Sequence, residues 1–245
     1  MAERGFEHSN NPPFRCSEAV LLLPFGRRSF LPAIVAALDG VEIPLDDTTD
    51  RIAYALRGSP CPVTLLYSGM GAPAAANALE MAAANGGRRL VVFGACGGVS
   101  PEVGVGDLVV ATAGVRGEGT SRYYAPAEYP AACDPLLTTR LWQEAASIAG
   151  VTAHRGTVFS TDASYRQGPE VYETYRGLVK AVECEVAAAA VVGARLGLAV
   201  GGLLFCTDNV TVPAERDRRY RGLADPRIRR GLELGLGAAV RALAM

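Results

Sequence analysis

The chain has 245 residues, of which 49% are apolar and 20% are charged, and its formal net charge at pH 7 is -1. This length suits one domain with a substantial core, and the balanced charge argues against a strongly basic nucleic-acid binder. No apolar run approaches the roughly 18 residues that a membrane-spanning helix requires, so we expect neither a nucleic acid nor a membrane as partner.

Cysteine and histidine usage bears on metal binding and on the compartment. The six cysteines stand apart without a C-x-x-C pair, and there are only two histidines, so we predict no metal site. Residues 1–15 contain acidic side chains and two prolines but no apolar segment like that of a signal peptide. We therefore expect a cytoplasmic protein with reduced thiols.

Apolar runs that suit strands alternate with helical patterns along the chain. After an irregular arm at residues 1–17, residues 18–245 are expected to form one domain. Asp134 is expected to cap a helix that begins at Pro135. The alternation predicts an α/β fold, a single domain whose central mixed twisted sheet is covered by helices on both faces. The predicted strands are 19–23, 63–67, 90–93, 107–111 and 198–205, and the predicted helices are 73–85, 135–149, 183–196 and 227–243.

Three glycine clusters follow predicted strands, at residues 24–26, 69–71 and 94–98. Glycine at such a place lets backbone N–H groups approach a ligand, and anions favour these sites. The alternative is that each cluster is only a turn. None of the three has the spacing of a dinucleotide fingerprint or a P-loop, so no nucleotide cofactor is predicted.

Acidic residues stand at two positions where they can act on a ligand. Glu183 and Glu185 open an alanine-rich helix, where they either complement the helix dipole or are partly buried and need partners such as ribose hydroxyls. Asp208 follows the apolar strand that ends at Phe205. It either forms a turn or a helix cap, or lies at the carboxyl edge of an open sheet, where such folds place their sites.

Six motifs follow one another between residues 69 and 209. They are Gly69-Met70-Gly71; Gly94 to Gly98 with Val105-Gly106-Asp107; Gly119-Thr120-Ser121 through Glu128-Tyr129-Pro130-Ala131; Asp162 and Tyr165 with Tyr172-Glu173-Thr174-Tyr175; Val182-Glu183-Cys184-Glu185; and Thr207-Asp208-Asn209. In this order they resemble the hexameric branch of the nucleoside phosphorylases, which includes purine nucleoside and uridine phosphorylases. The resemblance extends over nearly the whole chain and implies a small-molecule nucleoside as substrate.

The resemblance also implies roles for single residues. It places Glu185 on the 2′ and 3′ hydroxyls of the ribose, and Asp208 at N7 of a purine base as proton donor. One arginine among Arg216, Arg218, Arg219 and Arg221 would assist Asp208, or this stretch is a solvated charged loop. The remaining implied contacts are Glu183, Cys184 and a neighbouring subunit's His8 at the ribose, Tyr165, Cys96 and Gly97 at the base, and Gly26, Arg27, Ala95 and the neighbour's Arg51 at phosphate.

Two departures from the family pattern concern phosphate and the base. Val92 stands where the family has an arginine that binds phosphate, and Ala95 replaces a hydroxyl residue. Arg27 and Arg28 follow the first glycine turn out of register. Pro169 and Val171 replace the glutamine and arginine with which uridine phosphorylases hold uracil, so a site lacking those hydrogen bonds should not select uracil.

The resemblance predicts phosphorolysis of a purine nucleoside to the free base and ribose 1-phosphate, with inorganic phosphate as co-substrate and no cofactor. Two alternatives stand beside it: a hydrolytic nucleosidase of the same fold, and a non-catalytic nucleoside-binding protein. Nucleosidases also lack the phosphate arginine, but they carry a glutamate in the first loop, and residues 25–28 have none. Because His8 and Arg51 would serve a neighbour's site, we expect a homodimer, or a hexamer built as a trimer of dimers, with shared active sites.

Overall fold

Four parallel strands form the centre of the sheet in the computed structural model. In spatial order they are β4 (Val63–Tyr67), β1 (Ala19–Leu23), β5 (Arg89–Gly98) and β10 (Ala199–Asn209). Because these strands run in the same direction, their carboxyl ends meet at one edge of the sheet. The structure describes residues 15–25, 31–43, 45, 52–164, 166, 169–212, 214–215 and 224–244, without the side chains of 169–171.

Further strands close part of this sheet on itself. β6 (Leu108–Gly117) runs antiparallel to β10, and β8 (Ala153–Thr161) runs parallel to β6. The short β9 (Ala181–Glu183) lies parallel to β8 and antiparallel to β5, so the order β5, β10, β6, β8, β9 returns to β5. On the other side, β3 (Ile52–Leu56) and β2 (Gly40–Ile43) extend the sheet beyond β4, while β7 (Ala131–Ala132) pairs with β6.

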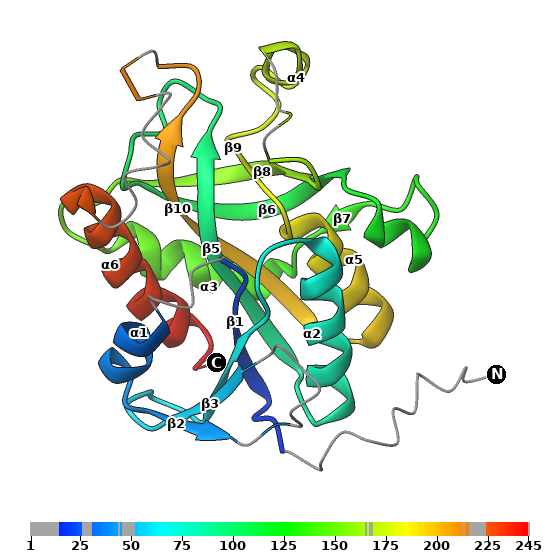
Figure 1. Cartoon of the computed structure of the whole chain (residues 1–245), viewed down its shortest axis with the longest axis vertical. Coiled ribbons are helices and arrows are strands. Elements are labelled where there is room, and N and C mark those ends of the chain that lie inside the picture. The colour runs from blue at the N-terminus through cyan, green and yellow to red at the C-terminus, as the bar shows by residue number, and fades with distance from the viewer. Residues whose placement is uncertain are drawn as a thin grey trace.

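Helices cover both faces of the sheet, as the sequence predicts (Figure 1). On one face α2 (Ala72–Ala84) and α5 (Val186–Leu196) pack on alternate strand residues such as Leu22 and Val92. On the other, α1 (Leu31–Ala37), α3 (Pro135–Ala146) and α6 (Pro226–Ala242) pack on the intervening residues, such as Leu21 and Phe93. Strands buried on both faces read as continuous apolar runs, which explains their recognition from sequence. The short α4 (Pro169–Thr174) and a 3-10 helix (Thr120–Tyr123) complete the described elements.

Several predicted elements are confirmed within a few residues. Strands 19–23 and 63–67 have the predicted bounds, and α2 and α6 lie within one residue of theirs. The carboxylate of Asp134 accepts a hydrogen bond from the backbone N–H of Leu137 at 2.8 Å and so caps α3, as expected. That helix ends at Ala146, three residues before the predicted end.

Several other predicted boundaries are wrong. Residues 94–98 are strand rather than turn, because β10 pairs with this stretch on one side and β9 pairs with its last two residues on the other. β10 continues to Asn209, so Asp208 lies inside the strand, just after a register shift at Cys206. The helix predicted from Glu183 begins only at Val186, because Glu183 belongs to β9. The sequence does not predict α1, α4, β2, β3, β7, β8, β9 or the 3-10 helix, and β6 extends six residues past its predicted end.

None of the described helices combines the length and the apolarity needed to span a bilayer. Within the described residues there is also no group of three or more His, Cys, Asp or Glu side chains arranged to hold a metal ion.

Candidate active site

The candidate site lies where β4, β5 and β10 end and where β9 leads into α5. Gly97 of β5 is its centre: it pairs with Val182 of β9 and with Asp208 of β10. A Cβ placed on Gly97 would lie 3.4 Å from Asp208 Oδ1 and 3.4 Å from Val182 Cγ1. Segments far apart in the chain therefore bring their side chains within a few ångströms of one another.

Glu185 is a buried acid at the edge of the first turn of α5. Its side chain is buried, and Oε1 accepts a hydrogen bond from the backbone N–H of Gly71 at 2.6 Å. Gly71 has a φ of 108°, a conformation that residues other than glycine rarely adopt, so the turn at Gly69–Gly71 can present this N–H only because glycine stands there. Burial, and secondarily the neighbouring Glu183, raises the pKa of Glu185 to about 8.

Glu183 is buried just before the start of α5, with its carboxylate turned to the helix. Its Oε2 accepts hydrogen bonds from the backbone N–H groups of Glu185 at 2.7 Å and of Val186 at 2.8 Å, and its Oε1 meets the hydroxyl of Ser160. Burial raises the pKa of Glu183, and these donors lower it. The structure thus gives Glu183 three partners within the protein.

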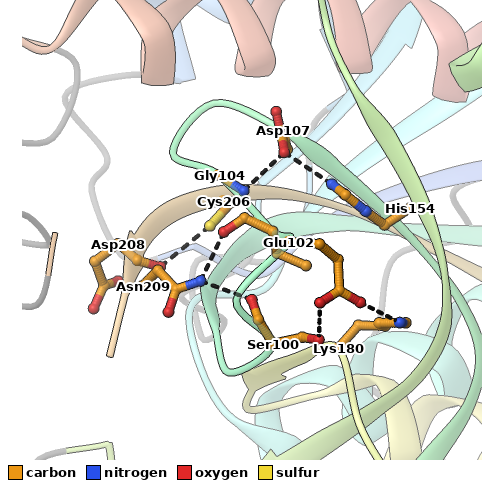
Figure 2. Close-up of polar contacts among 10 residues, drawn as sticks. Ser100, Glu102, Gly104, Asp107, His154, Lys180, Cys206, Asp208 and Asn209 are labelled. Carbon is orange, nitrogen blue, oxygen red and sulfur yellow. Dashed lines mark hydrogen bonds and ion pairs between the residues drawn. The ribbon is translucent and has the colours of Figure 1, made fainter. Parts of the chain in front are cut away.

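Asp208 is also buried, with 5% of its surface exposed. The hydroxyl of Thr207 lies 3.0 Å from Asp208 Oδ1 and 3.1 Å from the carbonyl oxygen of Cys96, so it can donate to either acceptor. The next residue, Asn209, secures the strand end: its Nδ2 donates to the carbonyl oxygens of Ser100 and Val103 (Figure 2). The turn after β5 and the carboxylate-bearing end of β10 are therefore fixed to each other.

Figure 2 also shows two groups of polar contacts, around Asp107 and around Glu102, that support the segments behind the site. Asp107 accepts from the backbone N–H of Gly104 and contacts His154 Nε2, each at 2.8 Å. Glu102 pairs with Lys180 and accepts from the Ser100 hydroxyl, and these hydrogen bonds lower the pKa of Glu102 to about 2. Asp107, part of the second glycine motif, thus has a structural role at the base of this turn.

Two thiols lie at the site, and both are neutral at physiological pH. A hydrogen bond with Cys206, together with burial, raises the pKa of Cys96 well above its usual value. Burial, with a smaller contribution from Glu185, raises the pKa of Cys184 to about 12. The Sγ of Cys184 lies 3.2 Å from the hydroxyl of Ser164, in the segment predicted to lie beside the base. These thiols offer polarizable apolar surface rather than a nucleophile.

A loop after β6 borders the site and is held by Arg116. The guanidinium donates to Ser121 Oγ and to the backbone carbonyls of residues 125, 126, 127 and 129. Within the loop, Glu118 accepts from the N–H of Ser121 at 2.9 Å, and Gly119 N–H donates to Asp162 Oδ2 at 2.8 Å. The last bond joins this loop to the segment that carries Ser164.

The phosphate positions that depart from the family pattern are apolar in the structure too. Val92 is fully buried in the core between α2 and the sheet, and Ala95 is half-buried with its methyl group against the core of the opposite face. Neither side chain has a hydrogen-bond donor for an anion.

The structure brings together Glu183, Cys184, Glu185, Cys96, Gly97 and Asp208, with Ala95 one residue before Cys96 on β5. Other predicted site residues lie outside the described part of the chain: His8, Gly26, Arg27, Arg28, Arg51, Tyr165, Arg216, Arg218, Arg219 and Arg221. The side chains of Pro169 and Val171 lie outside them as well.

Sequence reasoning did not identify Ser160, Arg116 or Glu118. Ser160 lies in β8, a strand with no clear apolar pattern at its start, and its neighbour Asp162 in the family motif was the only signal close to it. Glu118 is 1% exposed, and one of its oxygens has no hydrogen-bond partner within the described part of the chain. Nothing in the sequence near Glu118 indicates burial, which depends on the fold of the loop over α5.

Comparison with known proteins gives close relatives. Uridine phosphorylase of Escherichia coli K12 is 42% identical over 118 residues, which cover 48% of this chain and 46% of that protein. Uridine phosphorylase of Haemophilus influenzae is 36% identical over 175 residues, covering 71% and 68%. Guanosine phosphorylase of Halorubrum lacusprofundi is 30% identical over 181 residues, covering 72% and 75%. The chain spans about half the length of the Escherichia coli protein that it matches.

Solved structures share the fold. A uridine phosphorylase from Vibrio fischeri superimposes with a TM-score of 0.77 at 22% identity, covering 93% of this chain and 92% of that one. A purine nucleoside phosphorylase from Toxoplasma gondii gives a TM-score of 0.80 at 20% identity, covering 94% and 91%. Residues 30–225, most of the chain, match the sequence profile of the phosphorylase superfamily. On this match, and on the identity with the Haemophilus influenzae relative, this chain belongs to the phosphorylase superfamily.

Proposed function

We propose that this chain cleaves the N-glycosidic bond of a nucleoside, that the nucleoside is a purine nucleoside, and that inorganic phosphate takes the sugar. The proposal rests on the positions of two buried carboxylates, those of Asp208 and Glu185, near the strand pair formed by Gly97 and Val182. Asp208 lies against Gly97, and Glu185 follows Val182 by three residues. Membership of the superfamily supports the reaction class.

The two acids suit the two halves of the substrate. Cleavage passes through an oxocarbenium-like state in which positive charge builds on the sugar and negative charge on the departing base. Glu185 would bind the 2′ and 3′ hydroxyls and stabilise the charged sugar, while Cys184 lies beneath it. Asp208 would donate a proton or a hydrogen bond to the base, a contribution of about 10²–10⁴-fold for a general acid.

A purine base is favoured by Asp208, since a proton or hydrogen bond given to purine N7 offsets the negative charge that develops on the base as its bond from N9 to the sugar breaks. The relative named guanosine phosphorylase supports this choice. Uridine is the second candidate, because the Escherichia coli and Haemophilus influenzae relatives are uridine phosphorylases. Against uridine, Pro169 and Val171 have no side-chain hydrogen bond with which to recognise the edge of uracil.

Phosphate as co-substrate is supported by the names of the relatives, and its ligands in this chain are a proposal. Gly26, Arg27 and the neighbouring subunit's Arg51 would supply them, since Val92 and Ala95 offer no donor. Hydrolysis is the alternative acceptor reaction, and the apolar surroundings of Val92 are the observation that favours it.

One assay separates these possibilities. Inosine, guanosine, adenosine and uridine are incubated with the protein in phosphate and in a phosphate-free buffer, and the free base is quantified by liquid chromatography. We expect base release from the purine nucleosides only when phosphate is present. Equal release without phosphate would establish a nucleosidase, release from uridine alone would exclude the purine proposal, and binding without turnover would indicate a nucleoside-binding protein.

A further inference from the structure

The amino end of α5 is capped by side chains from two strands. Glu183 of β9 accepts from the N–H groups of Glu185 at 2.7 Å and Val186 at 2.8 Å. Ser160 of β8 accepts from the N–H of Ala187 at 2.8 Å and also meets the Glu183 carboxylate. These two side chains therefore satisfy backbone groups that an α-helix leaves unpaired at its start.

Glu183 and Glu185 differ in what remains available to a ligand. Both are 5% exposed, but three donors from within the protein already occupy Glu183. For Glu185 the described contacts of the carboxylate are with backbone N–H groups, the shortest of them that of Gly71 at 2.6 Å to Oε1. A buried carboxylate whose lone pairs are taken by the helix start has little left for sugar hydroxyls.

We propose that Glu183 is a positioning residue rather than a sugar ligand. With Ser160 it fixes the backbone at Glu185 and so determines where the Glu185 carboxylate meets the ribose. The inference rests on the proposed function, in which Glu185 is the group that binds the sugar.

The same arrangement divides charge between the two acids. Two adjacent buried carboxylates do not readily ionise together, and the one with more donors and the helix start beside it keeps the charge. Glu183 has both, so the proton resides on Glu185, whose pKa burial and then Glu183 raise to about 8. Nucleoside binding to an ionised Glu185 should therefore strengthen as pH rises toward this value.

Other titratable groups face the pair from neighbouring elements. The carboxylate of Glu118, after β6, adds to the raised pKa of Glu183. The thiols have pKa values raised to about 12 or well above the ordinary value, so they stay neutral over the pH range of the experiment. The acids that face the pair are Glu118 and Asp162, and the thiols are those of Cys96, Cys133 and Cys184.

The first test measures binding of a carbon-linked inosine analogue, which cannot be cleaved, by calorimetry at pH 7.5. Glu183→Gln retains an acceptor for both N–H groups and an amide for Ser160, so its Kd should stay within about threefold of the parent. Glu185→Gln should weaken binding about 10–100-fold, and Ser160→Ala about 3–10-fold through the lost cap. The proposal would be overturned if Glu183→Gln lost as much affinity for the analogue as Glu185→Gln, or if Ser160→Ala lost none.

The second test follows the Kd of the same analogue from pH 6 to pH 9. Binding by the parent should strengthen with pH, and in Glu183→Gln the midpoint should move down by about one unit. Glu102→Gln is the matched control, an acid that pairs with Lys180 outside the site, and its midpoint should not move. An unchanged midpoint in Glu183→Gln would refute the charge coupling between Glu183 and Glu185, because a role in the backbone structure alone predicts no change in the midpoint.

Failure of the proposed function is distinguished by a third measurement that needs no ligand. If the parent binds no analogue, the unfolding free energy still reports Glu185 between pH 5 and pH 8. The parent should lose stability as pH rises through this range, because only the folded protein holds the proton. Glu183→Gln should lose less stability over this range, and a loss equal to the parent's would overturn the division of charge between Glu183 and Glu185 independently of the activity.

Discussion

Single side chains at the site differ from their counterparts in water because they are buried. Glu185 and Asp208 are each 5% exposed, and the thiols of Cys96 and Cys184 are held neutral. A buried acid responds strongly to its neighbours, so small substitutions at these positions should change chemistry more than fold.

Changing Asp208 to Asn keeps the size of the side chain and removes its transferable proton. For inosine or guanosine we expect kcat to fall about 100-fold or more, with little change in KM, because the loss falls on the transition state. Glu102→Gln is the control, an acid that pairs with Lys180 outside the site, and it should leave kcat unchanged. Steady-state kinetics with full activity on every purine nucleoside would reduce Asp208 to a strand residue.

Replacing Glu185 by Gln should stabilise the folded protein while it weakens nucleoside binding. The pKa of Glu185 is raised to about 8, so between its ordinary value and pH 8 the folded state holds a proton that the unfolded state releases. Its contribution to stability is therefore greatest at low pH and declines as pH rises through this window. At pH 8 we expect Glu185→Gln to exceed the parent by at least about 1 kcal/mol in denaturant unfolding, with a smaller difference at pH 5.

At the scale of elements, the sequence predicted those whose signals are local. Asp134 and Pro135 mark the start of α3, and the apolar runs of β1 and β4 mark strands buried on both faces. The site acids Glu185 and Asp208 were found through motifs, but their surroundings were not. Glu183 carries the same local signal whether it begins a helix or ends a strand, and only its pairing through β9 with β5 and β8 decides.

The remaining misses share this cause. The glycine-rich residues 94–98 are strand because strands from distant parts of the chain pair with them, which overrides the preference of glycine for turns. β8 contains His154, Arg155 and Gly156 and has little apolar pattern there, yet it is fixed by its parallel pairing with β6. Contacts of this kind cannot be derived from residue types alone.

The cap of α3 offers a prediction about stability without activity. Asp134→Ala removes the acceptor for the Leu137 N–H and should cost about 1 kcal/mol of unfolding free energy. α3 packs with α6 on the face away from α5, so kcat per folded molecule should not change. Thr139→Ala is the control: its hydroxyl bonds to the carbonyl of Pro135 within the same exposed turn, and its loss should be close to neutral. Equal costs in the two variants would contradict the capping role.

At the scale of the whole molecule, the resemblance predicts that subunits share sites through His8 and Arg51. Mixing two inactive variants tests this prediction. In a dimer of His8→Ala with Glu185→Gln, one site combines an intact Glu185 with an intact His8 from its neighbour, so part of the activity should return after subunit exchange. Homogeneous samples of either variant are the controls. No recovery, or a fully active monomer in light scattering, would argue against shared sites.

The closed order of strands around β5 has a consequence for how the protein is made. Gly97 acquires its neighbours only when β9 and β10 pair with it, and Ala199 of β10 is matched with Arg89, more than a hundred positions earlier. Such distant pairings are entropically costly and form slowly. During synthesis the glycine-rich half of β5 therefore remains unpaired until residues up to Asn209 have left the ribosome. This unpaired half of β5 is the part of the nascent chain that a chaperone would bind first.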